Sequence, residues 1–227
     1  MHTVLGKPTC ALCQESTDKT AICEDCLADV NTLWFDEETV CKGCLRHTSD
    51  GLLCGHCQQH SPITCAQFAS FQYDYPVKQL LHAFKHLRQI HLSRALCTLM
   101  LQNPPIWLPE TPIDAVLAMP LSRERLLERG FNQSRFLAQS IADVYALPLL
   151  DDTAVLRQHR VPQSTLNGKA RLNNVRGIFQ AAADVKKSHL LLIDDVITTG
   201  ATVNELSKTL IKAGVKGIWV WALAHPK

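Results

Sequence analysis

Two adjacent carboxylates, Asp194 and Asp195, precede a short loop of small and hydroxyl-bearing residues. The loop residues that suit a ligand are Thr198, Thr199, Gly200, Ala201 and Thr202. Hydroxyl groups and the free N–H groups of a helix N-terminus bind phosphate, and glycine allows close approach to the backbone. Paired carboxylates repel phosphate but accept hydrogen bonds from two neighbouring hydroxyls. The run 194–202 therefore predicts a site for a sugar that carries both a phosphate and a vicinal diol.

The flanking patterns would place this run at the edge of a parallel sheet. Residues 190–193 are apolar without interruption, as in a strand that is buried on both faces. After the loop, apolar residues recur at helical spacing at Val203, Leu206, Leu210 and Ile211. Ligands of open α/β sheets bind beyond the carboxyl ends of the strands, where this loop would lie.

A strand that ends in carboxylates is also found in P-loop nucleotide-binding proteins. That class requires a GxxxxGK[ST] loop elsewhere in the chain. The candidate pair Gly168-Lys169 is followed by Ala170, and Gln163 stands where the first glycine is needed. The sequence therefore favours the sugar-phosphate site.

The run 194–202 resembles the phosphoribosyl pyrophosphate (PRPP) loop of type I phosphoribosyltransferases. The resemblance implies that Asp194 and Asp195 hold the ribose hydroxyls, that residues 198–202 hold the 5′-phosphate, and that Mg²⁺ binds together with PRPP. A second loop, Leu121-Ser122-Arg123, follows the apolar run 115–118 and is placed like the family's pyrophosphate loop. It implies a catalytic role for Arg123.

Two further segments have open interpretations. Lys85 lies in a helical pattern, on a solvated face or in contact with the pyrophosphate. The polar, basic segment 157–179 occupies the place of the family's mobile catalytic lid, but it could be an ordinary surface loop. The basic residues that a lid would contribute are Arg160, Lys169 and Arg171.

Eight of the ten cysteines form two copies of a C-x2-C-x9-C-x2-C unit, offset by 31 residues. The eight are Cys10, Cys13, Cys23, Cys26, Cys41, Cys44, Cys54 and Cys57. Because each repeat carries a complete set of ligands, we expect two consecutive four-thiolate sites rather than a cross-braced pair. Structural zinc is the typical ion of such sites. Disulfides and an iron–sulfur cluster are the alternatives.

Charge divides the 227-residue chain. Residues 1–65 carry nine acidic and four basic residues, whereas the remainder carries twelve acidic and nineteen basic ones. The basic part suits a polyphosphate, and the acidic part disfavours binding to a nucleic-acid backbone. No apolar run approaches the roughly 20 residues of a membrane helix, and no signal peptide is apparent, so we expect a cytoplasmic protein.

Together with the paired CxxC units, the motif Arg129-Gly130-Phe131-Asn132-Gln133 resembles the ComF family, also called GntX-like phosphoribosyltransferases. This implies an α/β fold of the type I phosphoribosyltransferase kind (a parallel sheet flanked by helices) over residues 63–227, after a double zinc ribbon over 1–62. It also implies a link to DNA uptake and DNA utilisation.

The resemblance leaves two functions open. One is transfer of phosphoribosyl from PRPP to a nitrogen acceptor, with Asp194, Asp195 and Arg123 as the catalytic set. The other is a non-catalytic sensor of PRPP or nucleotide, or a competence factor that binds single-stranded DNA or a protein of the competence machinery. Phosphoribosyltransferases that act on 6-oxopurines have a carboxylate where this chain has Thr198, so the acceptor stays unassigned.

Overall fold

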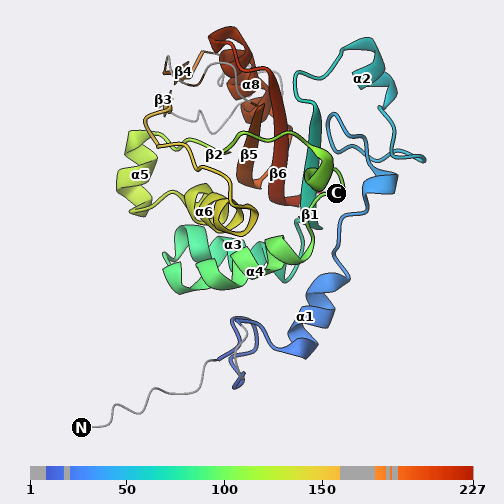
Figure 1. The fold of residues 1–227 in the computed structure, drawn as a ribbon. Helices are drawn as coiled ribbons and strands as arrows, with labels where there is room; N and C mark the ends of the chain where they lie inside the picture. The colour runs from blue at the N-terminus through green and yellow to red at the C-terminus, as the bar shows by residue number, and fades with distance from the viewer. Residues whose placement is uncertain (1–8, 18–20, 159–176, 183–184, 186–188, 227) are drawn as a thin grey trace, which may run out of the picture.

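The fold is built around a four-stranded parallel sheet, seen in a computed structural model that describes residues 9–17, 21–158, 177–182, 185 and 189–226 (Figure 1). The strand order is β1-β6-β5-β2. The strands are β1 (Ala66–Gln72), β2 (Ala115–Ala118), β5 (His189–Val196) and β6 (Gly217–His225). A separate antiparallel pair consists of β3 (Val155–Arg157) and β4 (Phe179–Ala181).

Helices cover both faces of the sheet, which confirms the predicted fold class. The α-helices are α1 (Glu24–Asn31), α2 (Gly55–Gln59), α3 (Val77–His86), α4 (Ser93–Gln102), α5 (Arg123–Arg129), α6 (Gln133–Tyr145) and α8 (Ala201–Ala213). The described residues also form the 3₁₀ turns η1 (Glu37–Thr39), η2 (Ile90–Leu92) and η3 (Leu108–Glu110). In the described part of the chain, none of these helices is both long and apolar enough to cross a bilayer.

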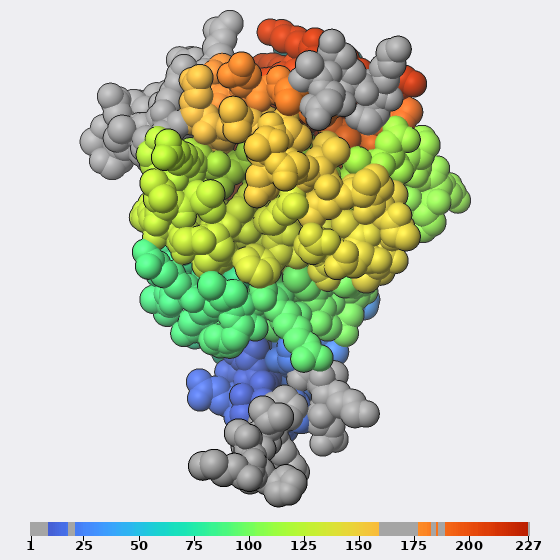
Figure 2. Space-filling view, turned by 60° about the vertical axis from the view of Figure 1, so that its left-hand side comes forward, coloured from blue at the N-terminus to red at the C-terminus, as the bar shows by residue number. Residues whose placement is uncertain are grey.

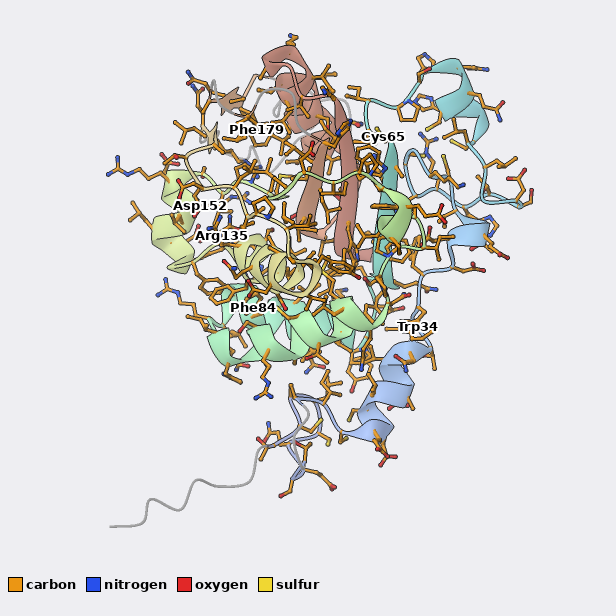
Figure 3. The ribbon with its side chains drawn as sticks, in the orientation of Figure 1. Trp34, Cys65, Phe84, Arg135, Asp152 and Phe179 are labelled. Carbon is orange, nitrogen blue, oxygen red and sulfur yellow. The ribbon has the colours of Figure 1, made fainter. Side chains whose placement is uncertain are left out.

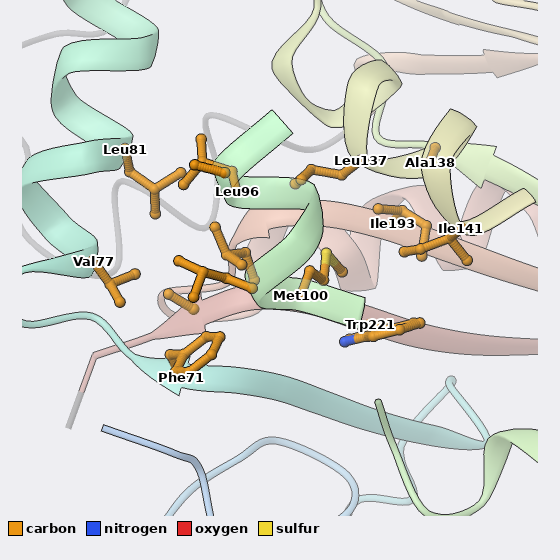
Figure 4. Close-up of a cluster of buried hydrophobic side chains, with 14 of the residues drawn as sticks. Phe71, Val77, Leu81, Leu96, Met100, Leu137, Ala138, Ile141, Ile193 and Trp221 are labelled. Atoms are coloured by element: carbon orange, nitrogen blue, oxygen red, sulfur yellow. The ribbon is translucent and has the colours of Figure 1, made fainter. Parts of the chain in front are cut away.

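The first face of the sheet packs against α3, α4 and α6. Figure 4 shows Leu96, Met100 and Leu137 from these helices meeting Ile193 of β5 and Trp221 of β6. Because β5 and β6 are central strands, their side chains are buried on both faces, and alternate residues belong to different hydrophobic clusters. The predicted buried strand and the helix that follows the loop are both confirmed.

The second face is covered by α8 and by the β3–β4 pair. Val203, Leu206 and Leu210 of α8 lie against Leu190 and Leu192 of β5. Helix α8 ends at Gly214, which has the left-handed φ of +100° that glycine adopts easily at a helix C-terminus. The two faces together fix the carboxyl end of β5, where the acidic pair lies.

The cysteine-rich segment straddles the edge of the sheet at β1. Backbone N–H groups of Phe35 and Gln72 donate to Ser70 O and Leu33 O, at 3.1 and 2.8 Å. These bonds cover the outer edge of β1, which would otherwise present unpaired backbone groups. The predicted division into residues 1–62 and 63–227 stays a prediction, and the segment shares hydrophobic contacts with both faces of the sheet.

The two cysteine repeats pack on opposite faces. Ile22 and Val30, near the first repeat, belong to the cluster of α3 and α4, whereas Val40 and Leu45, near the second, belong to the cluster of α8. In Figure 1, α1 lies below α4, while α2 lies beside the upper part of the sheet. Figure 2 shows the first described residues (blue) protruding beyond α3 and α4 (teal).

A buried hydrogen-bond chain joins β1 to β6 and yields a test of the core. Trp221 Nε1 donates to Ser70 Oγ at 2.9 Å, and Ser70 Oγ donates to Asn103 O at 2.9 Å. We expect Ser70→Ala to destabilise the protein by about 1–3 kcal/mol, because the indole N–H loses its buried acceptor. In a Trp221→Phe background the same change should cost clearly less, since there is no indole N–H to leave unpaired. Urea denaturation of the four proteins measures both costs.

Ser61, an exposed serine, provides the matched control: Ser61→Ala should change the free energy of unfolding by less than about 0.5 kcal/mol. Equal costs of Ser70→Ala in the two backgrounds would show that the indole–hydroxyl bond contributes nothing to stability.

Candidate functional site

The two carboxylates lie at the carboxyl end of β5 and are largely buried. Asp194 is 8% exposed and Asp195 is 4% exposed. Ser134 Oγ, at the start of α6, donates to Asp194 Oδ1 at 3.1 Å, and the backbone N–H of Asp195 donates to the same oxygen at 2.9 Å. Burial raises the pKa of Asp194 to about 6, although Lys85, the Ser134 hydroxyl and Arg157 act in the opposite direction. Ionised acids kept in such a place require a cationic partner.

That partner is Lys85, near the end of α3. Its ammonium forms an ion pair with Asp195 Oδ2, and its side chain is only 16% exposed. Burial lowers the pKa of Lys85 to about 8; the charge of Asp194 opposes this shift, while Arg129 and Arg125 add to it. The interpretation of Lys85 as part of a solvated face is therefore wrong. The side chain enters the site from the helical layer and contacts the acidic pair directly.

The acids and Lys85 line a polar cavity of about 180 Å³, named here the acid cavity. Its lining residues are Lys85, Met119, Pro120, Leu121, Arg125, Arg129, Gln133, Arg157, Asp194, Asp195, Val196 and Thr202. Three arginines from α5 and β3 therefore face the same space as the two carboxylates. Such a combination can bind hydroxyls at one end and an anionic oxygen cluster at the other.

Local contacts hold the arginines in place. Arg129 Nη1 donates to Gln133 Oε1 at 2.9 Å, and Arg157 Nη1 donates to Pro120 O at 3.2 Å. Arg125 and Arg129 are four residues apart on α5, so they share one side of that helix. This spacing is visible in the sequence, whereas Arg157 reaches the cavity only because β3 folds back over the end of β2.

The predicted pyrophosphate loop lies beside this cavity. Ser122 is the N-cap of α5, with its Oγ accepting from Arg125 N at 3.4 Å, and Leu121 lines the acid cavity. Arg123 is exposed and instead lines a neighbouring cavity of about 540 Å³ between α5 and the β3–β4 pair. Asp152 also lines this cavity and forms an ion pair with Arg135 at 3.4 Å, and Figure 3 shows the two side by side. Arg125, Arg129 and Arg157 thus lie nearer the carboxylates than Arg123 does.

The threonine loop turns directly from β5 into α8. Gly200 has φ of +70°, a left-handed conformation in which most other residues are strained, and α8 begins at the next residue. The loop encloses a small hollow of about 40 Å³, here the loop cavity, lined by Asp194 and by residues 196–203. Thr202 lines both the acid and the loop cavities, whereas Thr198 and Thr199 are exposed. The helix N-terminus therefore lies next to the acids, as predicted. The expected lid residues Arg160, Lys169 and Arg171 fall outside the described residues.

The eight repeated cysteines form two separate clusters in chain order. Cys10, Cys13, Cys23 and Cys26 make the first ribbon, and Cys41, Cys44, Cys54 and Cys57 make the second; in each, all four sulfur atoms lie within 4.8 Å of one another. The Cys13–Cys23 and Cys44–Cys54 sulfur pairs are 3.7 Å apart. Four sulfurs around one zinc would be about 3.8 Å apart. Consecutive sites are confirmed, and both clusters could hold zinc.

Backbone N–H groups favour the thiolate form at one cysteine of each cluster, Cys10 and Cys54, whereas burial raises the pKa of Cys26 and Cys57. Burial raises the pKa of Cys10, but N–H groups from Cys23, Cys13 and Leu12 outweigh it and bring the pKa to about 6. The N–H of Cys57 lowers the pKa of Cys54 to about 7. Thiolates are the form that binds metal. All ten cysteines lie in the described part of the chain and are free thiols there, which contradicts the disulfide alternative.

The chain is similar to one described protein family and to several named bacterial proteins. A family model described as "Phosphoribosyl transferase domain" matches residues 127–226. "Competence protein F" of Haemophilus influenzae is 30% identical, with 88% of this chain and 96% of that protein covered. "DNA utilization protein YhgH" of Escherichia coli is 29% identical, with 90% of each covered. "Competence protein ComFC" of Streptococcus pneumoniae is 28% identical, with 92% and 89% covered.

Among solved structures, a glutamine PRPP amidotransferase from B. subtilis, complexed with ADP and GMP, aligns with a TM-score of 0.38 and 18% identity. The alignment covers 56% of this chain and 25% of the amidotransferase chain. The full-length sequence relatives, the matched domain and the two four-cysteine clusters agree: this chain belongs to the ComF family of phosphoribosyltransferase-like proteins.

Proposed function

We propose that the protein binds PRPP with Mg²⁺ and transfers its phosphoribosyl group to a nitrogen acceptor. The observation that carries the proposal is the placement of Asp194 and Asp195 between two anion-binding features. On one side is the threonine loop at the N-terminus of α8, and on the other are Lys85 and the arginines of the acid cavity. PRPP carries a diol between a 5′-phosphate and a pyrophosphate, in the same order.

The charge of each group of residues determines which part of PRPP it binds. Asp194 and Asp195 accept hydrogen bonds from the ribose hydroxyls, and residues 198–202 donate to the 5′-phosphate. For Asp195 to bind a hydroxyl, Lys85 must release it, and the ammonium is then free to contact the pyrophosphate. Mg²⁺ would bind through oxygens of PRPP itself and neutralise part of the charge on the leaving group.

In the reaction, the bond between C1 of the ribose and the pyrophosphate oxygen breaks, and its electron pair leaves with pyrophosphate. The lone pair of the acceptor nitrogen forms the new bond to C1, and that nitrogen then loses its proton. Arg125, Arg129 and Arg157 stabilise the departing charge from the acid cavity, and Arg123 extends the basic surface at its rim.

The relatives named for competence and DNA utilisation favour a second candidate, in which the fold binds ligand without turnover. The excess of basic residues in 66–227, nineteen against twelve acidic ones, suits single-stranded DNA or an acidic partner of the competence machinery as that ligand. Pyrophosphate release that requires Asp195 supports the transferase, whereas salt-sensitive binding of single-stranded DNA that survives Asp195→Ala supports the binding module.

PRPP binding tests the proposal directly. We expect PRPP with Mg²⁺ to bind the wild-type protein in calorimetric titration, and Asp195→Asn to weaken binding at least about tenfold because it loses a charge-assisted acceptor. Asp143→Asn is the control: Asp143 is an exposed acid of α6, bonded to Gln139 Nε2 at 2.8 Å, and this change should leave binding unaltered. A folded wild-type protein that binds no PRPP at millimolar concentration contradicts the proposal.

Acids retained for a ligand should reduce the stability of the empty protein. Because burial raises the folded-state pKa of Asp194 from 3.8 to about 6, its ionisation disfavours folding as the pH rises through 6, and the penalty disappears below the unfolded value. We therefore expect Asp194→Asn to be more stable than wild type in urea at pH 7.5, with the gain shrinking toward zero as the pH falls to 4. Asp143→Asn should show no such trend. A variant less stable than wild type at pH 7.5 would show that Asp194 serves the fold.

Metal analysis tests the two ribbons. We expect about two zinc ions per chain in the wild type and about one after Cys44→Ser or Cys13→Ser, because each change removes one thiolate from one four-thiolate site. The same measurement separates zinc from iron. Fewer than one zinc per chain, or a stoichiometric amount of iron, would overturn the zinc assignment.

A further inference from the structure

A third cavity lies between the second ribbon and the threonine loop, with a volume of about 450 Å³. The residues that line this ribbon cavity are Trp34, Phe35, Asp36, Thr39, Val40, Leu45, Arg46, His47, Gln72, Thr198, Thr199, His225 and Pro226. We infer that the ribbon cavity binds a planar nitrogen heterocycle and that the second ribbon forms its wall. This inference rests on the proposed function, because such a ring would be the nitrogen acceptor.

The walls suit a flat ring. Trp34 is 46% exposed although it is a large aromatic residue, and Figure 3 places it beside β1, on the side of the sheet away from Arg135 and Asp152. Phe35 packs edge-on against the ring of His225, with the centroids 5.6 Å apart and the planes at 89°. Val40 and Leu45 complete an apolar surface. Ligand sites typically combine such surfaces with a few fixed polar groups.

The polar groups of the ribbon cavity favour a neutral heterocycle over a phosphate. Among its described lining residues, Arg46 is the one permanent cation, and the carboxylate of Asp36 offsets it. The acid cavity, by contrast, holds Lys85 and three arginines. A polyphosphate would therefore bind in the acid cavity, and a ring with both donor and acceptor groups would bind in the ribbon cavity.

His225 offers a defined hydrogen-bond acceptor to such a ring. Its Nδ1 lies 2.8 Å from Ile197 O, and a carbonyl oxygen only accepts, so Nδ1 carries the hydrogen. Burial lowers the pKa of His225, which favours the neutral imidazole, although the bond to Ile197 opposes the shift. In this tautomer Nε2 has a free lone pair. A ring N–H is the group that would complement it.

The ribbon cavity is contiguous with the proposed phosphoribosyl site. Thr198 and Thr199 line both the ribbon cavity and the loop cavity. The preceding residue, Ile197, donates its N–H to Ala224 O at 3.1 Å and accepts from His225, which fastens the loop to the end of β6. A ring in the ribbon cavity would therefore lie next to the loop proposed to hold the 5′-phosphate.

The second ribbon fixes the shape of this wall. Cys41 N donates to Arg46 O, Leu45 N donates to Cys41 O, and Thr48 N donates to Thr39 O, each at 2.8 Å. These bonds form the turn that presents Leu45, Arg46 and His47 to the cavity, and Cys41 and Cys44 lie within it. No residue between Cys10 and Cys26 is among the described lining, whereas Val40, Leu45, Arg46 and His47 of the second ribbon are. The two metal sites thus have different roles: the second is required for ring binding and the first is not.

The test titrates the full-length, metal-loaded protein with adenine, uracil and cytosine, followed by calorimetry and by saturation-transfer NMR. We expect at least one ring to bind with submillimolar affinity. Trp34→Ala should weaken its binding about tenfold, as expected from the loss of one stacking contact, and Arg46→Ala should also weaken it. Tyr75→Ala removes an aromatic side chain that is 72% exposed and outside the cavity, so it should have no effect.

The roles of the two ribbons are separated by two variants: Cys44→Ser disrupts the second ribbon and Cys13→Ser disrupts the first. We expect the first change to abolish ring binding while PRPP binding persists, and the second to preserve both. Where circular dichroism shows that Cys44→Ser is unfolded, His47→Ala replaces it, with weakened ring binding as the expected result. Absence of binding by all three rings, or binding unchanged in both Trp34→Ala and Arg46→Ala, overturns the inference.

The titrations with rings and with PRPP distinguish a failure of this inference from a failure of the proposed function. If the protein binds PRPP but none of the rings, the proposed phosphoribosyl site stands and the ribbon cavity is not the acceptor site. If the protein binds a ring through Trp34 but does not bind PRPP, the ring site in the ribbon cavity stands and the proposed transferase activity is contradicted.

Discussion

The buried ion pair between Lys85 and Asp195 is the interaction on which the site depends. Two adjacent carboxylates at the end of an apolar strand would be strongly disfavoured without a nearby cation, because burial removes their hydration. Lys85 supplies that cation, and Ser134 and the N–H of Asp195 donate to Asp194. Removing Lys85 alone would therefore leave an uncompensated charge. A ligand that binds the acids must provide donors of its own and a new anionic partner for the ammonium.

This requirement explains why the site draws on so many elements. Lys85 comes from α3, Ser134 from α6, Arg125 and Arg129 from α5, and Arg157 from β3. Helices α3 and α6 and strand β3 have an independent reason to pack on the sheet, since their apolar residues belong to the two hydrophobic clusters. Helix α5 buries no residue, and it is anchored by its N-cap Ser122 and by the bond from Arg129 to Gln133. The core thus fixes charged groups that would repel one another if they were free to move. Preorganised charge of this kind is what binding a polyphosphate requires.

The sequence predicted those parts of the site that depend on neighbours in the chain. The apolar run before Asp194, the glycine before α8 and the helical spacing of Val203, Leu206 and Leu210 are local patterns, and the structure has each of them. The repeat of CxxC pairs likewise predicted which cysteines cluster, because each unit is complete in itself. Lys85 was ambiguous because helical spacing identifies the apolar face of α3 but not what the end of that helix meets. Arg157 and the ribbon cavity depend on packing between segments that are far apart in the chain, and no local pattern reports it.

The duplicated ribbons show how identical ligand spacing can serve different ends. Both units have the same cysteine spacing and similar sulfur geometry, so the metal site does not distinguish them. Their neighbours do: Ile22 and Val30 join the helical layer of α3 and α4, whereas Phe35, Val40 and Leu45 join the face that carries α8. The chain between the units runs along the edge of β1, which places them on opposite faces of one sheet. Among the described residues, those of the second ribbon line a cavity together with the threonine loop and those of the first do not, so equal cysteine spacing leaves the two ribbons with different neighbours.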